Sequence, residues 1–340
     1  MDFKTELKMY QDIVNKELEK YIRKNKCIEK VLNSAMEYSL MAGGKRLRPI
    51  LVIATYKLFK ENIEECMPYA VAIEMVHNFS LIHDDLPGID NDDFRHGKPT
   101  NHKKFNEATA ILAGDGLLNN AYMVISNDLR NTKLNIETYN IENDKKEYNL
   151  NNLINSTRNK DNLENLNKKI MIFNEFSNAV DRMIAGEYID TEYEGKQVLE
   201  ENLEYMDENK TGALLKLSVR MGALLAKCTE EDVERLTSYA KKIGLAFQIK
   251  DDILSEEGDE KILGKPVGND KKLNKCTYVS KYGLEGAKDK LNKLIEEAIN
   301  DIKVYGEKAE FLMGLAMYIK DRERDYRKSC VNRISFRLIT

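Results

Sequence analysis

The sequence is poor in the residues that break helices, and it has no long apolar run. Proline occurs 5 times and glycine 18 times in 340 residues, below their usual shares of about 5% and 7%. So few turn-forming residues in a long chain favour long helices and little sheet. Because no apolar run approaches the roughly 18 residues of a transmembrane helix, we expect no membrane span.

Cysteine and excess positive charge are scarce as well. The 5 cysteines are odd in number and far apart, which argues against a disulfide framework and against a zinc ribbon. The first residues, MDFKTELKMYQ, are charged and contain no apolar signal core, so a reducing cytoplasm is the expected compartment. With 53 basic and 57 acidic residues the net charge is −4, whereas a general nucleic-acid binder carries a basic excess.

What the chain does contain is helical periodicity. Hydrophobic residues make up 42% and charged residues 32%, enough for a large core under a solvated surface. The length alone allows roughly two domains or one large one. No segment shows sustained alternation of apolar and polar residues, so we predict an all-α fold. Helices are expected near 3–22, 28–39, 49–58, 69–85, 108–126, 169–193, 203–226, 231–254, 284–304 and 308–323.

One stretch, 127–167, differs in composition from the rest. It contains 13 asparagines among 41 residues and only two aromatic residues, Tyr139 and Tyr148. Such a composition buries too little apolar surface to offset the entropy lost on ordering. We therefore expect a solvated, flexible insertion between two helices. A partner-binding loop is the alternative, although nothing in the sequence favours it.

Five aspartates lie within ten residues, directly after the apolar segment 70–81. They belong to the sequence DDLPGIDNDD and are Asp84, Asp85, Asp90, Asp92 and Asp93. A solvated acidic surface is one interpretation. Buried carboxylates without partners are costly, however. Oxygen ligands alone favour Mg²⁺, which completes its shell with water and phosphate.

A second acidic pair, Asp251-Asp252, ends another apolar segment and shares a helix face with Gln248. Two such pairs facing each other across a cavity would hold metal ions around one polyanion. Basic loops supply the complementary charge: Lys45, Arg46 and Arg48 in GGKRLRP, then Arg95 and Lys98, Lys210 beside Thr211, and Lys265. GGKRLRP alone could be a basic surface loop. Together the clusters indicate a diphosphate bound through both Mg²⁺ and basic side chains.

All four histidines lie between His77 and His102. Neither their spacing nor a nearby cysteine supports a zinc site. His83-Asp84 is similar to the His-Asp pair of metal-dependent phosphohydrolases, which stays a rival hypothesis. His77 is either a core histidine or a phosphate ligand on the helix face of Asp84.

These motifs resemble those of the trans-isoprenyl diphosphate synthases, the polyprenyl synthetase family. The matching segments run in the family's order and cover nearly the whole chain outside 127–167. They are GGKRLRP (43–49), LIHDDLPGIDNDD (81–93), GKPT (97–100), AGD (113–115), KTGA (210–213), FQIKDDIL (247–254) and LGKPVG (263–268). Within the family, the branch that makes farnesyl diphosphate in bacteria is the most similar.

The resemblance implies a single all-α domain over 1–340, a helical bundle around a central cavity, and a homodimer. It also implies an Mg²⁺-dependent head-to-tail condensation of isopentenyl diphosphate with dimethylallyl or geranyl diphosphate, giving farnesyl diphosphate and diphosphate. The allylic substrate loses diphosphate, the double bond of isopentenyl diphosphate attacks the resulting carbocation, and a proton is then lost.

Residue roles follow from the resemblance motif by motif. Asp84, Asp90 and Asp251 would bind three Mg²⁺ ions, assisted by Asp85 and Asp252. The allylic diphosphate or the carbocation would meet Arg95, Lys210, Thr211, Gln248 and Lys265. Isopentenyl diphosphate would meet Lys45, Arg48, His77 and His96. Phe79 and Ser80, five and four residues before Asp84, would limit the chain length of the product.

Three positions depart from the family's pattern. His96 stands where a second arginine is usual, Ser255 where a third aspartate is usual, and Glu187 where a glutamine usually precedes Asp190. We expect them to affect affinity more than reaction class. A geranylgeranyl product, a non-catalytic subunit of a heterodimer and a terpene cyclase stay open as alternatives, and Phe79 could simply be a core residue.

Overall fold

Long helices dominate the structure, as the sequence predicts. The computed structural model describes residues 1–24, 29–132, 157–192, 205–206, 208–257 and 277–322. The helices are α1 (Phe3–Lys24), α2 (Lys30–Leu40), α3 (Leu47–Lys57), α4 (Met67–Asp84), α5 (Asn101–Lys104), α6 (Glu107–Asn131), α8 (Thr157–Glu192), α10 (Ala213–Leu225), α11 (Glu230–Glu257), α14 (Tyr278–Ile302) and α15 (Glu310–Asp321). Short helical turns add η1 (Ile63–Glu65), η2 (Glu208–Gly212) and η3 (Lys303–Ala309). The prediction of an all-α fold is confirmed.

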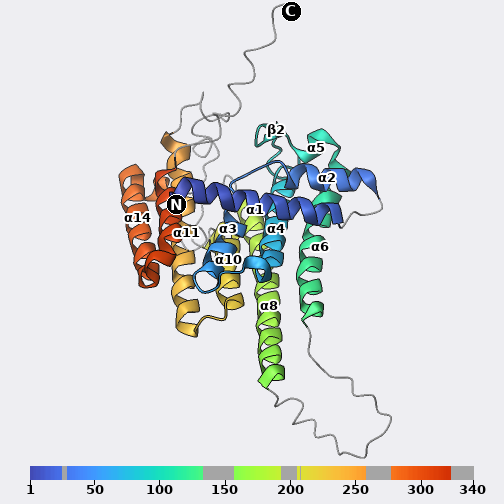
Figure 1. Ribbon diagram of the computed structural model, residues 1–340. Coiled ribbons are helices and arrows are strands. Elements are labelled where there is room, and N and C mark those ends of the chain that lie inside the picture. Colours follow the sequence, from blue (N-terminus) through green and yellow to red (C-terminus); the bar gives the residue numbers. More distant parts are fainter. Residues whose placement is uncertain (25–28, 133–156, 193–204, 207, 258–276, 323–340) are drawn as a thin grey trace, which may run out of the picture.

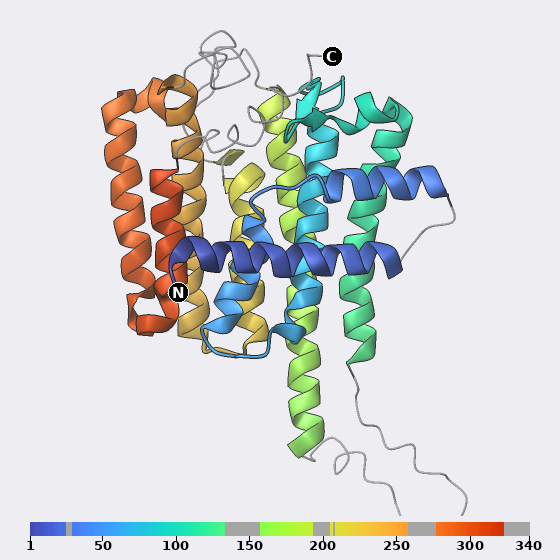
Figure 2. The same cartoon turned by 45° about the horizontal axis from the view of Figure 1, so that its top comes forward.

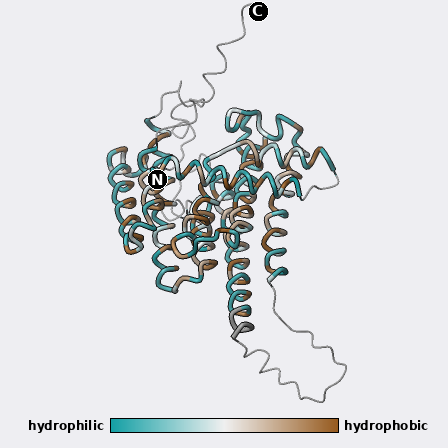
Figure 3. The backbone as a smooth tube through the Cα atoms, viewed as in Figure 1, coloured by the Kyte–Doolittle hydropathy of each residue, from teal (hydrophilic) through white to brown (hydrophobic). Residues whose placement is uncertain are grey.

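The centre of the molecule is formed by three strongly apolar helices, α3, α4 and α10 (Figure 3). Twelve of the 18 residues of α4 are buried. Such a helix is hydrophobic almost all round, and it is stable only when other helices cover it. Neighbouring helices accordingly pack against it, with α6 along one side and α3 along another. The carboxyl end of α4 therefore brings its polar residues directly out of the core.

The remaining helices surround this centre. α8 and α11 pack against α10, and α14 and α15 pack against α11. α1 runs across the roughly parallel central helices (Figures 1 and 2). No helix in the described part of the chain combines the length and the apolar character needed to span a bilayer.

Sequence patterns did not predict one element, a small antiparallel hairpin. β1 (Phe94–Arg95) pairs with β2 (Lys98–Pro99). The two residues between them, His96 and Gly97, have φ angles of 51° and 73°. Positive φ at both loop positions is the geometry of a tight two-residue hairpin turn, for which a glycine at the second position is favoured. The hairpin escaped prediction because four residues are too few to show alternation.

The asparagine-rich stretch is helical at both ends. α6 continues to Asn131, and α8 begins at Thr157. The part between them, where we expect a flexible insertion, lies outside the described residues. The expected helix over 203–226 begins differently from the prediction, because η2 is a π-helical turn that precedes α10.

Candidate active site

The end of α4 carries the first acidic motif. Asp85 is buried, with 3% of its surface exposed, and Arg95 binds it from the hairpin. The Arg95 Nε atom lies 2.8 and 2.9 Å from the two carboxylate oxygens of Asp85, and Nη2 lies 2.6 Å from Oδ1. Burial raises the pKa of Asp85, although the Arg95 hydrogen bond opposes that shift. Asp85 and Arg95 thus neutralise each other and fix the hairpin on α4.

Asp84 lies in a different electrostatic environment. It is half-buried, and burial is the largest cause that raises its pKa. The negative charges of Glu187 and Asp90 raise that pKa further, while Lys210 and Arg95 only partly oppose the rise. Asp90 is exposed, and its backbone N–H donates to the Asp84 carbonyl at 2.8 Å. The ionised form of Asp84 is therefore disfavoured in the free protein, and a bound cation would stabilise it.

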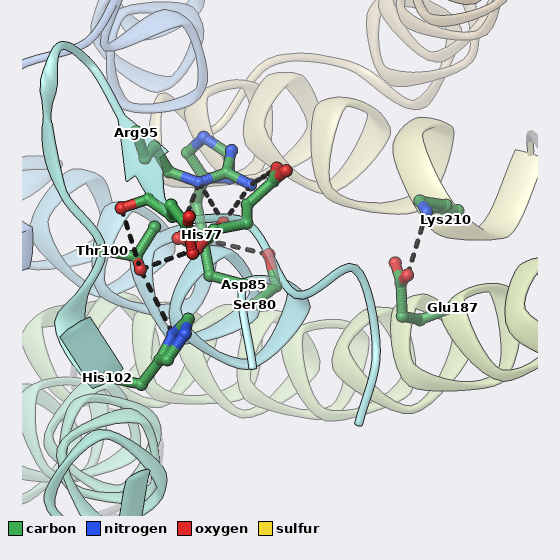
Figure 4. Close-up of polar contacts among 10 residues, drawn as sticks. His77, Ser80, Asp85, Arg95, Thr100, His102, Glu187 and Lys210 are labelled. Atoms are coloured by element: carbon green, nitrogen blue, oxygen red, sulfur yellow. Dashed lines mark hydrogen bonds and ion pairs between the residues drawn. The ribbon is translucent and has the colours of Figure 1, made fainter. Parts of the chain in front are cut away.

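Lys210 lies opposite the first acidic motif, on η2. Its ammonium contacts Glu187 Oε1 at 2.9 Å and Asp190 Oδ2 at 2.6 Å, both on α8. Burial by itself would lower the pKa of Lys210, but the two carboxylates raise it above its usual value, so the side chain stays cationic. Figure 4 shows the Lys210–Glu187 pair on one side and the Asp85–Arg95 pair on the other.

A close approach of two backbones holds η2 against α8. A Cβ atom added to Gly186 would lie 2.3 Å from the Lys210 backbone nitrogen. Only glycine leaves room for such a contact. Gly186 therefore allows η2 to reach α8, which puts Lys210 beside Glu187 and Asp190.

The second acidic motif joins this site through a chain of polar side chains. The Thr211 hydroxyl donates to Gln248 Oε1 at 3.4 Å, and Gln248 Nε2 donates to Asp252 Oδ1 at 3.3 Å. Asp252 is largely buried and accepts the Tyr278 N–H at 2.8 Å, at the beginning of α14. Asp251 points elsewhere, with Oδ1 2.8 Å from Arg322 Nη2.

Arg322 contacts three groups of α11 at once. It pairs with Asp251, donates to the Phe247 carbonyl at 2.8 Å, and stacks its guanidinium 3.9 Å from the centre of the Phe247 ring. Arg322 is buried, whereas the Asp251 side chain is 46% exposed. An arginine thus neutralises the residue for which the sequence predicts a metal ion.

The basic loop before α3 has an inward and an outward part. Arg46, with φ of 53°, is buried. It pairs with Glu74 at 2.6 Å and donates to the Leu40 carbonyl at 2.6 Å. The other two basic residues, Lys45 and Arg48, are half-buried. Arg46 therefore anchors the loop, and its neighbours Lys45 and Arg48 are only partly covered.

Two buried nitrogen atoms near this loop lack hydrogen-bond partners among the described residues: Arg48 Nε and His77 Nδ1. Burial lowers the pKa of Arg48 to about 10, despite the opposing charges of Glu74 and Asp84. Burial, followed by the charges of Arg48 and Arg95, lowers the pKa of His77 well below its usual value. Burial and the charges of Arg95, Arg46 and Lys45 lower the pKa of His96 in the same way. These groups therefore gather around one place, and an anion is the ligand that would stabilise their charge.

The donor set fits Mg²⁺ better than a caged metal. Among the described residues, no three histidine, cysteine, aspartate or glutamate side chains converge on a single point. Mg²⁺ binds through one or two carboxylates and takes its other ligands from water and substrate phosphates. Asp84, whose ionised form is disfavoured in the free protein, and the exposed Asp90 beside it are consistent with this mode of metal binding.

His83 and Phe79 face α6 rather than the acidic motif. His83 Nε2 lies 3.1 Å from the Ile111 carbonyl, and its ring packs against Phe79 with centroids 4.7 Å apart. Gly114 makes room for the imidazole, because a Cβ there would lie 2.3 Å from His83 Nε2. His83 thus serves packing between α4 and α6, which disfavours a His-Asp hydrolase. Ser80 donates to the His77 carbonyl at 3.0 Å.

Not every predicted site residue can be placed. Lys265 lies outside the described residues, as do the other residues of LGKPVG. Conversely, Arg322 was absent from the sequence-based assignment, and Arg46, Glu187 and Asp190 were named there without the contacts that the structure gives them. Glu187 and Asp190 share a helix face at i, i+3 spacing, a weaker signal than the consecutive aspartates that end α4 and lie near the end of α11. Arg322 has no comparable signal, because its partners are brought to it only by the fold.

Comparisons with known proteins agree with the geometry. The polyprenyl synthetase family model matches residues 29–312. A farnesyl diphosphate synthase of Bacillus subtilis is 42% identical over 269 residues, covering 78% of this chain and 80% of the relative. A geranylgeranyl diphosphate synthase of Cyanophora paradoxa is 39% identical over 289 residues, covering 85% and 86%. The crystal structure of an FPP/GFPP synthase from Zymomonas mobilis superposes with a TM-score of 0.74 at 32% identity, covering 93% and 99%. The chain therefore belongs to the polyprenyl synthetase family.

Proposed function

We propose that the protein is a short-chain prenyltransferase that condenses isopentenyl diphosphate with dimethylallyl or geranyl diphosphate, and that its main product is farnesyl diphosphate. One observation carries the proposal. Asp84, whose pKa is raised by burial and by neighbouring carboxylates, lies beside half-buried cationic and imidazole side chains, in which Arg48 Nε and His77 Nδ1 have no hydrogen-bond partner among the described residues. Such a pair of charged regions suits two diphosphates, one bound through metal and one through side chains.

The residues have distinct roles in this proposal. Lys210, fixed by Glu187 and Asp190, presents its ammonium to the diphosphate that leaves the allylic carbon. Arg48 and His77 hold the diphosphate of isopentenyl diphosphate, so that its double bond faces the allylic carbon. The Thr211 hydroxyl and the Gln248 amide offer dipoles to the carbocation. The allylic C–O bond breaks, a C–C bond forms, and the proton lost from the adduct goes to an oxygen of the departing diphosphate.

We also propose that Mg²⁺ is required, with three ions in the complete complex. Asp84 and Asp90 would hold two ions, and Asp251, which pairs with Arg322 in this structure, would exchange that partner for the third ion. When bound, Mg²⁺ neutralises the allylic diphosphate and stabilises the charge that develops on it as it leaves. Asp85 and Asp252, which bind Arg95 and the Tyr278 amide, would keep the ends of α4 and α11 in place rather than contact an ion.

A product longer than farnesyl diphosphate is the second candidate. It is favoured by the similarity to a geranylgeranyl diphosphate synthase and to a solved structure described as an FPP/GFPP synthase. Against it stands the bulk of Phe79, which is 7% exposed on α4. A non-catalytic subunit is a weaker candidate, since the acidic residues and Lys210 are all present.

We propose further that the chain works as one domain in a homodimer in the cytoplasm. Large apolar side chains are exposed on two neighbouring helices, α6 and α8, and a second copy would cover them. Among the described cysteines, Cys66 and Cys228 are free thiols, as expected for a reducing compartment.

The test is a product analysis. The purified protein is incubated with Mg²⁺, isopentenyl diphosphate and either dimethylallyl or geranyl diphosphate, and the products are identified by mass. The C15 diphosphate is expected from both primers, and Asp84→Asn protein serves as the control. Absence of elongation with every primer would overturn the proposal, and release of inorganic phosphate would favour a hydrolase.

A further inference from the structure

A second basic region lies outside the site described above. A cavity of about 510 Å³ opens between α8, η2, α10, α11 and α14. Its basic lining residues are Arg182, Lys216, Lys241 and Lys242, and Glu208 is its acidic one. Lys242 is neutralised by Asp301 at 2.7 Å. Among the described residues, no acidic side chain forms an ion pair with the other three.

These three cations converge from three different helices. Arg182 is exposed on α8, Lys216 is half-buried on α10, and Lys241 is exposed on α11. Burial is the largest cause that lowers the pKa of Lys216, and the charges of Arg182 and Lys241 lower it further despite Glu208. Like charges held together around a cavity cost free energy, and a bound anion would relieve that cost.

The rest of the lining is apolar or aromatic, with Leu245, Leu294, Tyr205 and Tyr278. A volume of this size is typical of small-molecule sites. Three separate cations exceed what a singly charged anion needs, and they suit a diphosphate with several charged oxygens. We propose that this cavity is a second diphosphate-binding site, for free diphosphate or for a diphosphate that carries a hydrocarbon chain. That the anion is a diphosphate and not another polyanion rests on the proposed function. The existence of the basic cavity does not depend on that function.

The cavity differs from the candidate active site but shares two of its walls. Glu208 and Gly212 of η2 line it, whereas Lys210 of the same turn contacts Glu187 and Asp190 on α8. Tyr278 also lines it, and the Tyr278 amide binds Asp252. A ligand in the cavity therefore touches both the turn that carries Lys210 and the residue that fixes Asp252, so its binding is expected to change the rate of prenyl transfer.

Lysine and arginine side chains bind an anion without a metal ion. Binding in the absence of metal therefore distinguishes the cavity from an Mg²⁺-dependent site. Binding of inorganic diphosphate and of farnesyl diphosphate is measured by calorimetry in EDTA, on the wild-type protein and on the double variant Lys216→Gln/Lys241→Gln. Lys308→Gln, which removes an exposed lysine of η3 outside the cavity, is the control for loss of a surface charge. Arg48→Gln, changed only in the candidate active site, shows whether that site contributes.

We expect metal-independent binding of one diphosphate per chain in the wild-type, Lys308→Gln and Arg48→Gln proteins. The double variant should bind about tenfold or more weakly, as expected for two lost charge-assisted contacts. Binding of inorganic diphosphate would identify the free ion as the source, and binding of farnesyl diphosphate alone would identify a prenyl diphosphate. Either result supports the proposal. Equal affinity in the double variant and in Lys308→Gln, or no metal-independent binding at all, would overturn it.

Initial rates of condensation with Mg²⁺ are measured on the same proteins. The double variant should retain the wild-type rate before product accumulates, because neither lysine contacts the candidate active site. If the double variant loses metal-independent binding but still condenses the substrates, the result concerns the cavity and not the candidate active site. Absence of condensation in the wild type would instead refute the proposed function and leave the binding result standing.

Discussion

At the scale of single residues, His96 is the departure from the family's sequence pattern that has the clearest physical consequence. Burial and the charges of Arg95, Arg46 and Lys45 lower the pKa of His96 from the usual histidine value, which favours the neutral imidazole. The family pattern that the sequence resembles has a second arginine at this position. We expect His96→Arg to lower the KM for isopentenyl diphosphate about three- to tenfold, because a charged donor binds a phosphate more strongly than a neutral one.

Initial rates with varied isopentenyl diphosphate test this expectation, and His96→Gln should behave like the wild type. The difference between His96→Arg and wild type should be the same at pH 7 and pH 8, since the lowered pKa favours the neutral imidazole at both. An unchanged KM in His96→Arg would show that position 96 does not contact the substrate.

Phe79 is the residue on which the length of the product depends in our proposal. Its ring is buried on α4 and packs against His83. If it forms the end of the chain-binding space, Phe79→Ala should give products of C20 or longer, because a cavity replaces the ring. Product masses with geranyl diphosphate as primer measure this. Phe79→Leu, which keeps most of the volume, should stay at C15. Unchanged products in Phe79→Ala would make Phe79 a core residue only.

Asp84 illustrates a conflict between stability and function. Burial and the charges of Glu187 and Asp90 disfavour its carboxylate in the free protein. Asp84→Asn should therefore raise the melting temperature in EDTA, by about 2–6 °C, while abolishing Mg²⁺-dependent condensation. Thermal unfolding followed by circular dichroism measures the first effect. Asp90→Asn is the control, because Asp90 is exposed and its removal should change the melting temperature much less.

The sequence singles out these residues as candidates, but it does not predict their contacts. Asp84, Lys210 and Arg48 stand out because charge next to an apolar helix is costly unless it has a use. That Asp85 binds Arg95 and that Asp251 binds Arg322 could not be predicted. Consecutive carboxylates have the same composition and the same helix position, and only tertiary packing decides which one faces a guanidinium.

At the scale of elements, the basic loop before α3 depends on one buried ion pair. Arg46 and Glu74 are 3% and 2% exposed and 2.6 Å apart. Removing one member of such a pair leaves a buried charge without a partner and costs roughly 3–5 kcal/mol. Glu74→Ala should lower the free energy of unfolding by about that amount. It should also raise the KM for isopentenyl diphosphate, because Lys45 and Arg48 would lose their anchor.

Urea denaturation measures the loss, and Glu64→Ala, on exposed η1, is the matched control. A change below 1 kcal/mol in Glu74→Ala would show that water or another group compensates Arg46.

Elements were predicted well where they are long and apolar. The bounds expected for α4 and α11 differ from the structure by only a few residues, because burial makes their pattern strong. The hairpin and the π-helical turn η2 were missed. Both are too short for a repeating pattern of apolar residues to be recognised in the sequence. In addition, η2 depends on a contact with Gly186 in a different helix.

At the scale of the whole molecule, two neighbouring helices expose large apolar side chains. Leu112 and Met123 of α6 are 56% and 45% exposed, and Ile184 and Tyr188 of α8 are 47% and 66% exposed. The members of each pair recur at helical spacing, although the polar residues Asp115 and Asn119 are exposed between Leu112 and Met123 on α6. Exposed large apolar side chains that gather on neighbouring helices are typical of interaction sites.

The last prediction is that a second copy of the chain covers these exposed apolar side chains of α6 and α8. A stable dimer needs roughly 1,200–2,000 Å² of buried surface, and a charge in its centre is strongly unfavourable. Leu112→Glu/Ile184→Glu should therefore convert a dimer into a monomer, as measured by size-exclusion chromatography with light scattering. The matched control is Val31→Glu/Val304→Glu, which places the same charges on exposed valines outside α6 and α8 and should leave the dimer intact. A monomeric wild type, or a dimer that survives both charges on α6 and α8, would place the interface elsewhere.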